Sequence, residues 1–258
     1  MKESSGTTAD IVRQTVNVLA LVGTVVANGL ANALPLNGQT TGEISDRFDV
    51  YFVPAGYVFS IWGLIYLSLG AFVVYQALPG QRDNPALRRV GYLFALSCVA
   101  NVAWLFLWHY ERFPLTIVAM VALLLLLIGI YVRLGIGRTP ASAAERWFVR
   151  VPFSIYLGWV TVATVANASQ LLVYLNWGGW GISPEVWTLI MLGAATAITA
   201  AVAITRGDVA YGLVIVWAFV GISVKHTDTP IVATTAWVMT GVVVLVTALG
   251  AWLNRQPG

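Results

Sequence analysis

Amide and aromatic side chains occur well inside the apolar segments of this sequence. Asn28 and Asn32 lie one helical turn apart, and Trp62 and Tyr66 repeat this spacing on another segment. An amide offers both hydrogen-bond donors and acceptors, and an indole or phenol ring offers a flat apolar face. These residue types can hold a neutral planar molecule without transferring a proton. The candidate binding residues found from position are Asn28, Asn32, Trp62, Tyr66, Asn101, Trp104 and Asn167.

Two interpretations of these residues are open. In the first, the amides form hydrogen bonds between helices, each contributing roughly 0.6 kcal/mol, and the rings fill the interior. In the second, rings and amides line a pocket for a flat apolar ligand. The long connection 35–53 would cap that pocket, with Phe48, Tyr51 and Phe52 as lid residues, because long loops in compact proteins are often functional. Spacing alone favours the first interpretation.

Ionisable residues are missing from the centres of the apolar segments. Proton pumps, ion-coupled carriers and voltage sensors need such groups at depth. A retinal protein needs a buried lysine, whereas Lys225 lies at a segment end without an intramembrane carboxylate. Neither a nucleophilic triad nor a pair of intramembrane carboxylates can be assembled. The sequence therefore predicts a protein that is neither an ion-driven pump nor an enzyme.

The residues closest to a metal-binding pattern are His109 with Glu111 in one short connection and His226 with Asp228 in another. None of the tight spacings that specify zinc is present. We expect these side chains to be solvated loop residues. The single cysteine, Cys98, lies in an apolar run and is expected to be a small apolar filler. The sequence thus predicts no metal site and no obligatory cofactor.

The elements that must position these residues are membrane helices. Of 258 residues, 59% are hydrophobic and 10% are charged, against roughly 25% charged residues in a soluble domain. Lipid must therefore solvate most of the chain. The net charge of +3 comes from basic residues in short loops, where they orient a membrane protein and indicate no nucleic-acid partner.

Eight segments are long and apolar enough to cross a bilayer, which takes about 20 residues in a helix. Backbone groups in hydrocarbon need internal partners, so each segment is predicted to be helical. The predicted fold class is an all-α integral membrane protein with eight transmembrane helices. The segments are 12–34, 54–77, 88–108, 114–134, 148–175, 184–205, 208–224 and 231–253.

The positions of basic residues test this count. With both termini in the cytoplasm, eleven of the fourteen Lys and Arg residues lie on the inner side, Lys2 and Arg255 among them. Arg47, Arg112 and Lys225 lie on the outer side, which gives the asymmetry that the positive-inside rule requires. Removing one helix would scramble the pattern. The prediction is a multi-pass protein of the cell (inner) membrane with both termini cytoplasmic.

Three motifs follow one another on the second, third and fifth apolar segments. They are Pro54-Ala-Gly-Tyr-Val-Phe-Ser-Ile-Trp62-Gly-Leu-Ile-Tyr66, then Asn101-Val-Ala-Trp104, then Trp159, Ala163 and Asn167 at four-residue spacing. In this order they give residues 12–177 a resemblance to the TspO/translocator protein family, also called tryptophan-rich sensory proteins.

The resemblance implies a five-helix membrane bundle that binds porphyrins and other tetrapyrroles, or in some members sterols. The ligand-binding positions that it implies here are Trp62, Tyr66, Asn101, Trp104, Trp159 and Asn167. The family's Trp-Tyr and Lys-Pro signature before the second helix is missing, and Phe48–Val53 stands in its place. This difference from the family lies at the mouth of the implied pocket, so the ligand of this chain can differ from the family's ligands.

Three parts of the chain are predicted on this basis. A cytoplasmic tail covers 1–11, and a TspO-like bundle with the outer loop 35–53 covers 12–177. A three-helix extension covers 178–258, and its helices within 184–253 lie outside the resemblance.

Three functions are considered. The leading one is binding or sensing of a hydrophobic planar ligand, with a tetrapyrrole as the candidate. The second is transport of such a ligand without ion coupling. The third is a structural or accessory role in a membrane complex or homo-oligomer formed through the helices in 184–253. The expected partners are the lipid bilayer and a hydrophobic small molecule, not nucleic acid.

Overall fold

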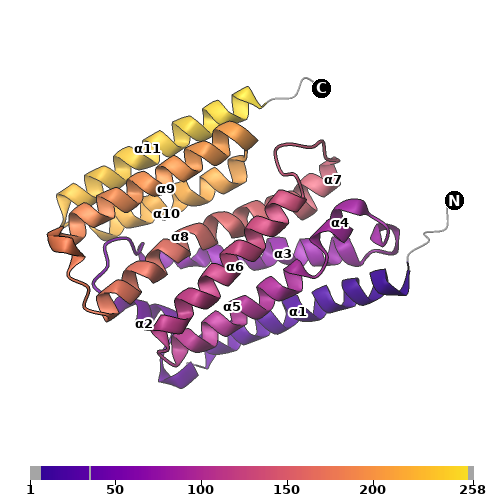
Figure 1. Ribbon diagram of the computed structural model, residues 1–258, viewed down its shortest axis with the longest axis horizontal. Coiled ribbons are helices and arrows are strands. Elements are labelled where there is room, and N and C mark those ends of the chain that lie inside the picture. Colours follow the sequence, from indigo (N-terminus) through magenta and orange to yellow (C-terminus); the bar gives the residue numbers. More distant parts are fainter. Residues whose placement is uncertain (1–6, 35, 255–258) are drawn as a thin grey trace. The chain divides into compact units, whose positions relative to one another are not determined.

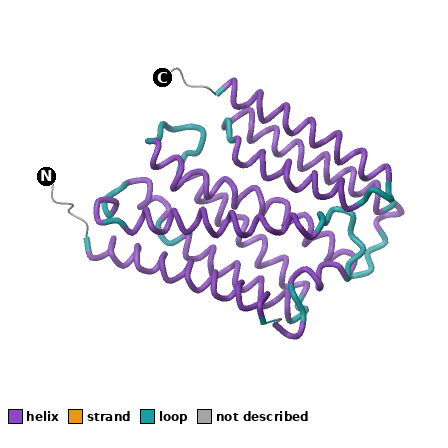
Figure 2. The backbone as a smooth tube through the Cα atoms, turned by 180° about the vertical axis from the view of Figure 1, so that it is seen from behind, coloured by secondary structure: helices purple, strands orange, loops and turns teal. Residues whose placement is uncertain are grey.

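The computed structural model describes residues 7–34 and 36–254 of the chain. Helices joined by short loops make up this described part, as Figure 2 shows, and it contains no strand. Outside it lie Lys2, most of the predicted tail 1–11, Pro35 and Arg255.

The α-helices in the described residues, labelled in Figure 1, follow the apolar segments of the sequence. They are α1 (Thr8–Ala33), α2 (Thr41–Asp46), α3 (Ile61–Ala77), α4 (Pro85–Val90), α5 (Leu93–His109), α6 (Phe113–Arg133), α7 (Ala143–Glu145), α8 (Val151–Tyr174), α9 (Pro184–Arg206), α10 (Val209–Lys225) and α11 (Pro230–Leu253). Shorter helical turns are η1 (Leu36–Gly38), η2 (Gly56–Ser60), η3 (Pro79–Gln81), η4 (Arg146–Arg150) and η5 (Gly179–Gly181).

Local sequence signals start and stop the long helices. Thr7 and Asp10 cap the start of α1 reciprocally, because each side chain accepts a hydrogen bond from the other residue's backbone amide. Pro184 opens α9, where a missing N–H costs nothing. Gly207 ends α9 with a φ of 61°, and Asp208 then caps α10. The tight turn between α9 and α10 is therefore made of two adjoining caps.

Six helices in the described residues are long and apolar enough to cross a membrane. They are Thr8–Ala33, Gly56–Ala77, Phe113–Arg133, Ala143–Tyr174, Pro184–Arg206 and Pro230–Leu253. Two other apolar helices, α5 and α10, have 17 residues each. At about 1.5 Å per residue such a helix measures about 26 Å, slightly less than the hydrocarbon core of about 30 Å. The chain is thus an all-helical, multi-pass membrane protein, and the predicted count of eight depends on these two shorter helices.

Two compact units divide the chain, and each is assembled from separate stretches of sequence. Unit 1 consists of Met1–Ile44, Trp62–Gly135 and Ala141–Tyr156, and unit 2 of Ser45–Ile61, Ile136–Pro140 and Leu157–Gly258. One boundary falls within α8, after Tyr156, whereas the division drawn from sequence motifs falls after residue 177.

Helix α5 is central to unit 1, because it packs against both α1 and α6 (Figure 1). Three phenylalanines form part of the core of this unit. Phe72 lies edge-on to Phe94 and to Phe153, with ring centroids 5.1 and 4.9 Å apart, and all three rings are buried. Edge-to-face packing is a favoured geometry for aromatic rings.

In unit 2, helices α9, α10 and α11 lie side by side and contact one another in pairs (Figure 1). A methyl group at Gly250 would overlap the carbonyl oxygen of Ala203, so the backbones of α11 and α9 nearly touch. Small residues permit this close approach in membrane proteins. Likewise, a methyl group at Gly221 would overlap Val58, and the Ala55 amide donates to the Gly221 carbonyl at 3.1 Å. The segment before α3 is thereby fixed against α10.

Large apolar side chains point outward from both units. Leu67 of unit 1 is 77% exposed, and Leu245 of unit 2 is 70% exposed. Water would penalise such surfaces, whereas lipid tails solvate them. These surfaces fit the membrane environment that the composition predicts.

Candidate functional site

The predicted binding residues are divided between the two units. Unit 1 contains Asn28, Asn32, Trp62, Tyr66, Asn101 and Trp104, and unit 2 contains Trp159, Asn167, Phe48, Tyr51 and Phe52.

Asn101 links three elements of unit 1. Its Oδ1 accepts a hydrogen bond from Asn28 Nδ2 at 2.9 Å, and its Nδ2 donates to the Tyr156 hydroxyl at 3.0 Å. The Trp62 ring stacks on Tyr66 with centroids 5.5 Å apart and meets Tyr156 edge-on at 6.1 Å. We call these five residues the amide–aromatic cluster. Its two amides bond within the cluster, as the first of the two sequence-based interpretations expects.

Tyr156 belongs to this cluster but was missed in the sequence. The signal that could have found it is a tyrosine in the middle of an apolar segment, since a buried tyrosine hydroxyl usually takes a partner. The Tyr66 hydroxyl is also buried, yet it has no hydrogen-bond partner among the described residues. It is therefore available to donate a hydrogen bond to a ligand.

Asn32 and Trp104 are predicted site residues that are not among those five. Asn32 is exposed, and its Nδ2 donates to the carbonyl of Asn28 on its own helix at 2.9 Å. Trp104 stacks on Trp108 with centroids 5.5 Å apart, and Trp108 Nε1 donates to the carbonyl of Thr41 at 3.2 Å. Trp104 therefore belongs to a second aromatic group, near the end of α5.

His109 is not a solvated loop residue, contrary to our expectation. It is the last residue of α5 and is fully buried. Its Nδ1 lies 3.0 Å from the carbonyl oxygen of Leu36, and its Nε2 lies 3.1 Å from the Thr41 hydroxyl. A carbonyl only accepts, so Nδ1 is the donor of this hydrogen bond. His109 fastens the start of the outer loop to α5, and the described residues contain no group of three metal-ligating side chains.

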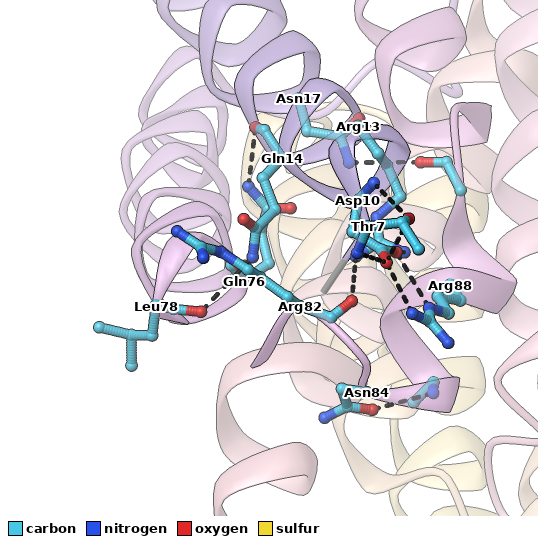
Figure 3. Close-up of polar contacts among 12 residues, drawn as sticks. Thr7, Asp10, Arg13, Gln14, Asn17, Gln76, Leu78, Arg82, Asn84 and Arg88 are labelled. Carbon is cyan, nitrogen blue, oxygen red and sulfur yellow. Dashed lines mark hydrogen bonds and ion pairs between the residues drawn. The ribbon is translucent and has the colours of Figure 1, made fainter. Parts of the chain in front are cut away.

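A second polar network of unit 1 surrounds the start of α1 (Figure 3). Asp10 accepts two hydrogen bonds from Arg88, at 2.9 and 2.6 Å, and forms an ion pair with Arg13 at 3.1 Å. Arg13 also donates to the carbonyl of Arg82 at 3.0 Å. Asp10 and Arg13 are each only 5% exposed. Ion pairs and hydrogen bonds stabilise buried charges, so this network holds α1 in place, although Arg13 Nε has no hydrogen-bond partner among the described residues.

Amide side chains extend the same network along α1 (Figure 3). Gln14 donates to the carbonyl of Gln76, and Gln76 donates back to the carbonyl of Gln14 at 3.0 Å. Asn17 donates to the carbonyl of Gly91 at 3.2 Å. These bonds satisfy carbonyls near the end of α3 and before α5, so the network is structural.

In unit 2, Trp159 and Asn167 are interior residues of α8, each 2% exposed. Trp159 meets Phe59 edge-on with centroids 5.7 Å apart. Among the predicted lid residues, Phe52 is fully buried, whereas Phe48 and Tyr51 are partly exposed. Phe52 is therefore an interior anchor of the loop.

A cavity of about 390 Å³ opens in unit 2. Four stretches form its wall: the end of the long outer loop, the end of α8, the α8–α9 connection and the first half of α9. The lining residues are Asp49, Val50, Tyr51, Ser169, Leu172, Val173, Trp177, Gly178, Gly179, Ile182, Pro184, Trp187, Thr188 and Met191. Of the predicted site residues, Tyr51 lines this cavity.

Trp177 of the α8–α9 connection and Trp187 of α9 form one side of the cavity. The Trp177 ring centroid lies 5.3 Å from those of Trp180 and Trp187. Trp187 Nε1 donates to the carbonyl of Gly179 at 2.9 Å, and Trp180 takes a φ of 54° that folds the connection back. Trp177 and Trp187 were not among the residues predicted to bind a ligand, yet both line the cavity. Their signal is the crowding of tryptophan and glycine between residues 177 and 187.

Tyr51 connects the cavity to its rim. Its hydroxyl donates to Glu185 at 3.3 Å, and its ring meets His226 edge-on with centroids 5.1 Å apart. Burial raises the pKa of Tyr51, so the phenol stays protonated as a donor. Burial also lowers the pKa of His226, and the neighbouring Lys225 ammonium acts in the same direction. The rim therefore contains a neutral histidine beside a hydrogen-bonded tyrosine at neutral pH.

A family model described as TSPO-like protein matches residues 14–249. The chain belongs to this family. The match includes α9, α10 and α11, whereas the resemblance drawn from motifs ends at residue 177. No match was found among curated proteins or among solved structures.

The cavity of this TSPO-like protein has the character of a binding site. Its volume of about 390 Å³ lies within the usual range of roughly 300–1,000 Å³ for small-molecule pockets. Most of its lining side chains are apolar or aromatic, with a few polar groups at defined positions. Such a surface can orient a hydrophobic molecule.

Proposed function

We propose that this TSPO-like protein binds or senses a hydrophobic planar ligand, with a tetrapyrrole as the candidate class. The observation that carries the proposal is the tryptophan-walled cavity beside Tyr51. Flat rings stack well on the indole faces of Trp177 and Trp187. The amide–aromatic cluster, where Tyr66 keeps an available hydroxyl, is the second place where a ligand can bind. The proposal includes no catalytic step.

Titration with a neutral porphyrin, octaethylporphyrin, tests this proposal. The purified chain should give a saturable change in porphyrin absorbance and quenching of tryptophan fluorescence. Trp187→Leu should weaken binding by about tenfold, because it removes one stacking face, and Trp252→Leu is the matched control at the exposed end of α11. If Trp62→Leu weakens binding instead, the ligand lies at the amide–aromatic cluster. If neither the unmodified protein nor any variant binds the porphyrin saturably, the proposal is contradicted.

The spectrum of the protein as isolated gives an independent test. The protein is purified gently from its native membrane, and its absorption spectrum and extracted small molecules are measured. A co-purifying tetrapyrrole supports the proposal and names the ligand. A clean protein spectrum with phospholipid alone favours a structural role, which the mutual bonding of Asn28 and Asn101 also favours. Stable partner subunits in mild detergent would then be expected.

Transport of the ligand without ion coupling is a further alternative from the sequence. It requires a pathway that reaches both membrane faces. Flux of a porphyrin into sealed vesicles that contain the protein separates transport from binding alone.

We further propose that α5 and α10 cross the bilayer, which gives eight spans in the inner membrane with both termini in the cytoplasm. The charge asymmetry supports this topology, and local thinning of the bilayer accommodates a helix a few ångströms short. This topology is tested with single cysteines introduced at Glu111 or Arg138 in a Cys98→Ser background. A membrane-impermeant maleimide is added to intact cells, and labelling of each cysteine is measured. Eight spans predict labelling at 111 and protection at 138. Six spans, without α5 and α10, predict the reverse.

A further inference from the structure

Most side-chain donors on the cavity wall are already engaged inside unit 2. The Tyr51 hydroxyl donates to Glu185 at 3.3 Å. The hydroxyls of Ser169 and Thr188 each donate to a carbonyl one turn earlier on their own helix, at 2.9 Å. The Trp187 indole nitrogen donates to a backbone carbonyl at 2.9 Å. A ligand therefore finds few free donors on this wall.

Acceptors on the same wall remain open. A hydroxyl that donates one hydrogen bond keeps lone pairs that can accept another. The Asp49 carboxylate lines the cavity and has no hydrogen bond or ion pair with any described residue. Trp177 is the one side-chain donor of the wall that has no hydrogen bond within the described part of the chain. The wall thus favours a ligand that donates hydrogen bonds.

The charged residues at the cavity also favour a ligand that donates hydrogen bonds, in particular a cation. Asp49 is the one Asp, Glu, Lys, Arg or His residue in the described lining, and Glu185 adds a second negative charge next to Tyr51. The nearby cations lie off the wall: Lys225 is paired with Asp46 at 3.4 Å, and Arg47 does not line the cavity. The indole faces of the wall attract cations as well, through their ring quadrupoles.

We infer that this cavity takes a flat apolar molecule that carries a positively charged nitrogen. The apolar body lies against the indoles of Trp177 and Trp187 and the aliphatic side chains of Leu172 and Met191. The charged nitrogen meets Asp49 and the open hydroxyl oxygens. This inference rests on the proposed function and narrows the class of ligand. The negative charge at the cavity repels a ligand with free carboxylates and attracts a cationic one.

A charged nitrogen of this kind has two sources in a membrane. One is a flat lipophilic amine, as the inference states, and the other is the ammonium group of a lipid headgroup such as phosphatidylethanolamine, which would meet Asp49 without a flat body. Displacement of a bound cationic probe by lysophosphatidylethanolamine, compared with its displacement by lysophosphatidylglycerol, separates the two sources. Displacement by the first lipid alone assigns the natural occupant to the lipid source, and displacement by neither assigns it to a free amine.

Three pyrene probes test the inference with the full chain in maltoside detergent at pH 7.5. They are 1-pyrenemethylamine, which is protonated at this pH, neutral 1-methylpyrene, and 1-pyrenecarboxylate. Quenching of tryptophan fluorescence reports binding. The cation is expected to bind about tenfold more tightly than the anion, with the neutral probe between them.

Asp49→Asn is the decisive variant, since Asp49 is exposed and its side chain makes no bond that the fold requires. It should weaken binding of the cation about fivefold, as loss of a partly exposed charge pair does, and leave the neutral probe unchanged. Asp83→Asn, at an exposed carboxylate that does not line the cavity, is the matched control and should change none of the three affinities.

The outcomes separate this inference from the proposed function. Equal or tighter binding of the anion, or an Asp49→Asn variant that keeps the full preference for the cation, overturns the inference. If the neutral probe still binds saturably in those cases, the proposed function stands. If no probe binds saturably, both fail.

Discussion

Tyr51 donates a hydrogen bond to Glu185 at 3.3 Å, and this bond joins the long outer loop to the first turn of α9 at the rim of the cavity. The two residues are 134 positions apart in the sequence. At the rim of the cavity, the bond thus links two elements that no local motif connects.

Replacing Tyr51 with phenylalanine keeps the ring and removes the bond. We expect Tyr51→Phe to lower the free energy of unfolding by about 1 kcal/mol, the usual net value of one hydrogen bond. Thermal unfolding in detergent, followed by tryptophan fluorescence, measures the change. Tyr57→Phe is the control, because Tyr57 is exposed and its hydroxyl makes no hydrogen bond with a described residue. Equal effects of the two variants would contradict the role of the bond.

Asn101 is expected to be the most sensitive residue of the amide–aromatic cluster. Asn101→Leu fills the space but leaves the Asn28 amide and the Tyr156 hydroxyl without their shared partner. We expect a loss of about 1–3 kcal/mol in the free energy of unfolding. Asn32→Leu removes an exposed amide bonded to its own helix and should cost much less. A comparable loss for both, in thermal unfolding, would show that the link through Asn101 contributes little.

The helices of this protein could largely be predicted from the sequence, because hydrocarbon sets their minimum length. The predicted segments 114–134 and 184–205 differ by one residue at most from the ends of α6 and α9. The second segment is less accurate, since Pro54 starts an irregular stretch and regular helix begins only at Ile61. Apolar length alone does not show such an interruption.

The cavity could not be predicted, because it depends on how the connection between α8 and α9 folds. Trp180 and Asn176 take left-handed backbone conformations, with φ of 54° and 52°, which non-glycine residues seldom adopt. These turns bring Trp177 beside Trp187. Asn101 and Asn167 are buried, whereas Asn32 is exposed, and periodicity does not give the partner of each amide. His109 shows the same limit, since its place beside Leu36 is a tertiary contact.

The buried ion pairs at the start of α1 are expected to be essential for stability. Asp10→Asn removes the charge that faces Arg88 and the buried Arg13 (Figure 3). Arg13 would then be a buried charge without its carboxylate, so the unfolding midpoint is expected to fall clearly. Arg89→Gln, at an exposed arginine of α4 with no ion pair in the described residues, is the control and should cost less than about 1 kcal/mol. Monodispersity after mild heating and the unfolding midpoint check both variants.

Acidification should destabilise unit 2 through His226. Burial lowers the pKa of this residue below its ordinary value of 6.5 in the folded protein. The unfolded chain therefore binds the proton more readily, and the free energy of unfolding falls as pH drops below about 6.5. The loss is complete once pH lies below the folded pKa. Above pH 7 His226 is neutral in both the folded and the unfolded chain, so it contributes almost no pH dependence to the free energy of unfolding there.

His226→Gln isolates this contribution, because glutamine is polar but does not titrate. We expect the variant to lose a smaller part of its unfolding midpoint between pH 7.5 and pH 5 than the unmodified protein loses. His109→Gln is the comparison for the other histidine. Since Tyr51 packs on His226, binding of the neutral pyrene probe should weaken over the same pH interval in the unmodified protein and change less in His226→Gln. If the pH profiles of stability and binding in His226→Gln equal those of the unmodified protein, the acid sensitivity lies elsewhere in the chain.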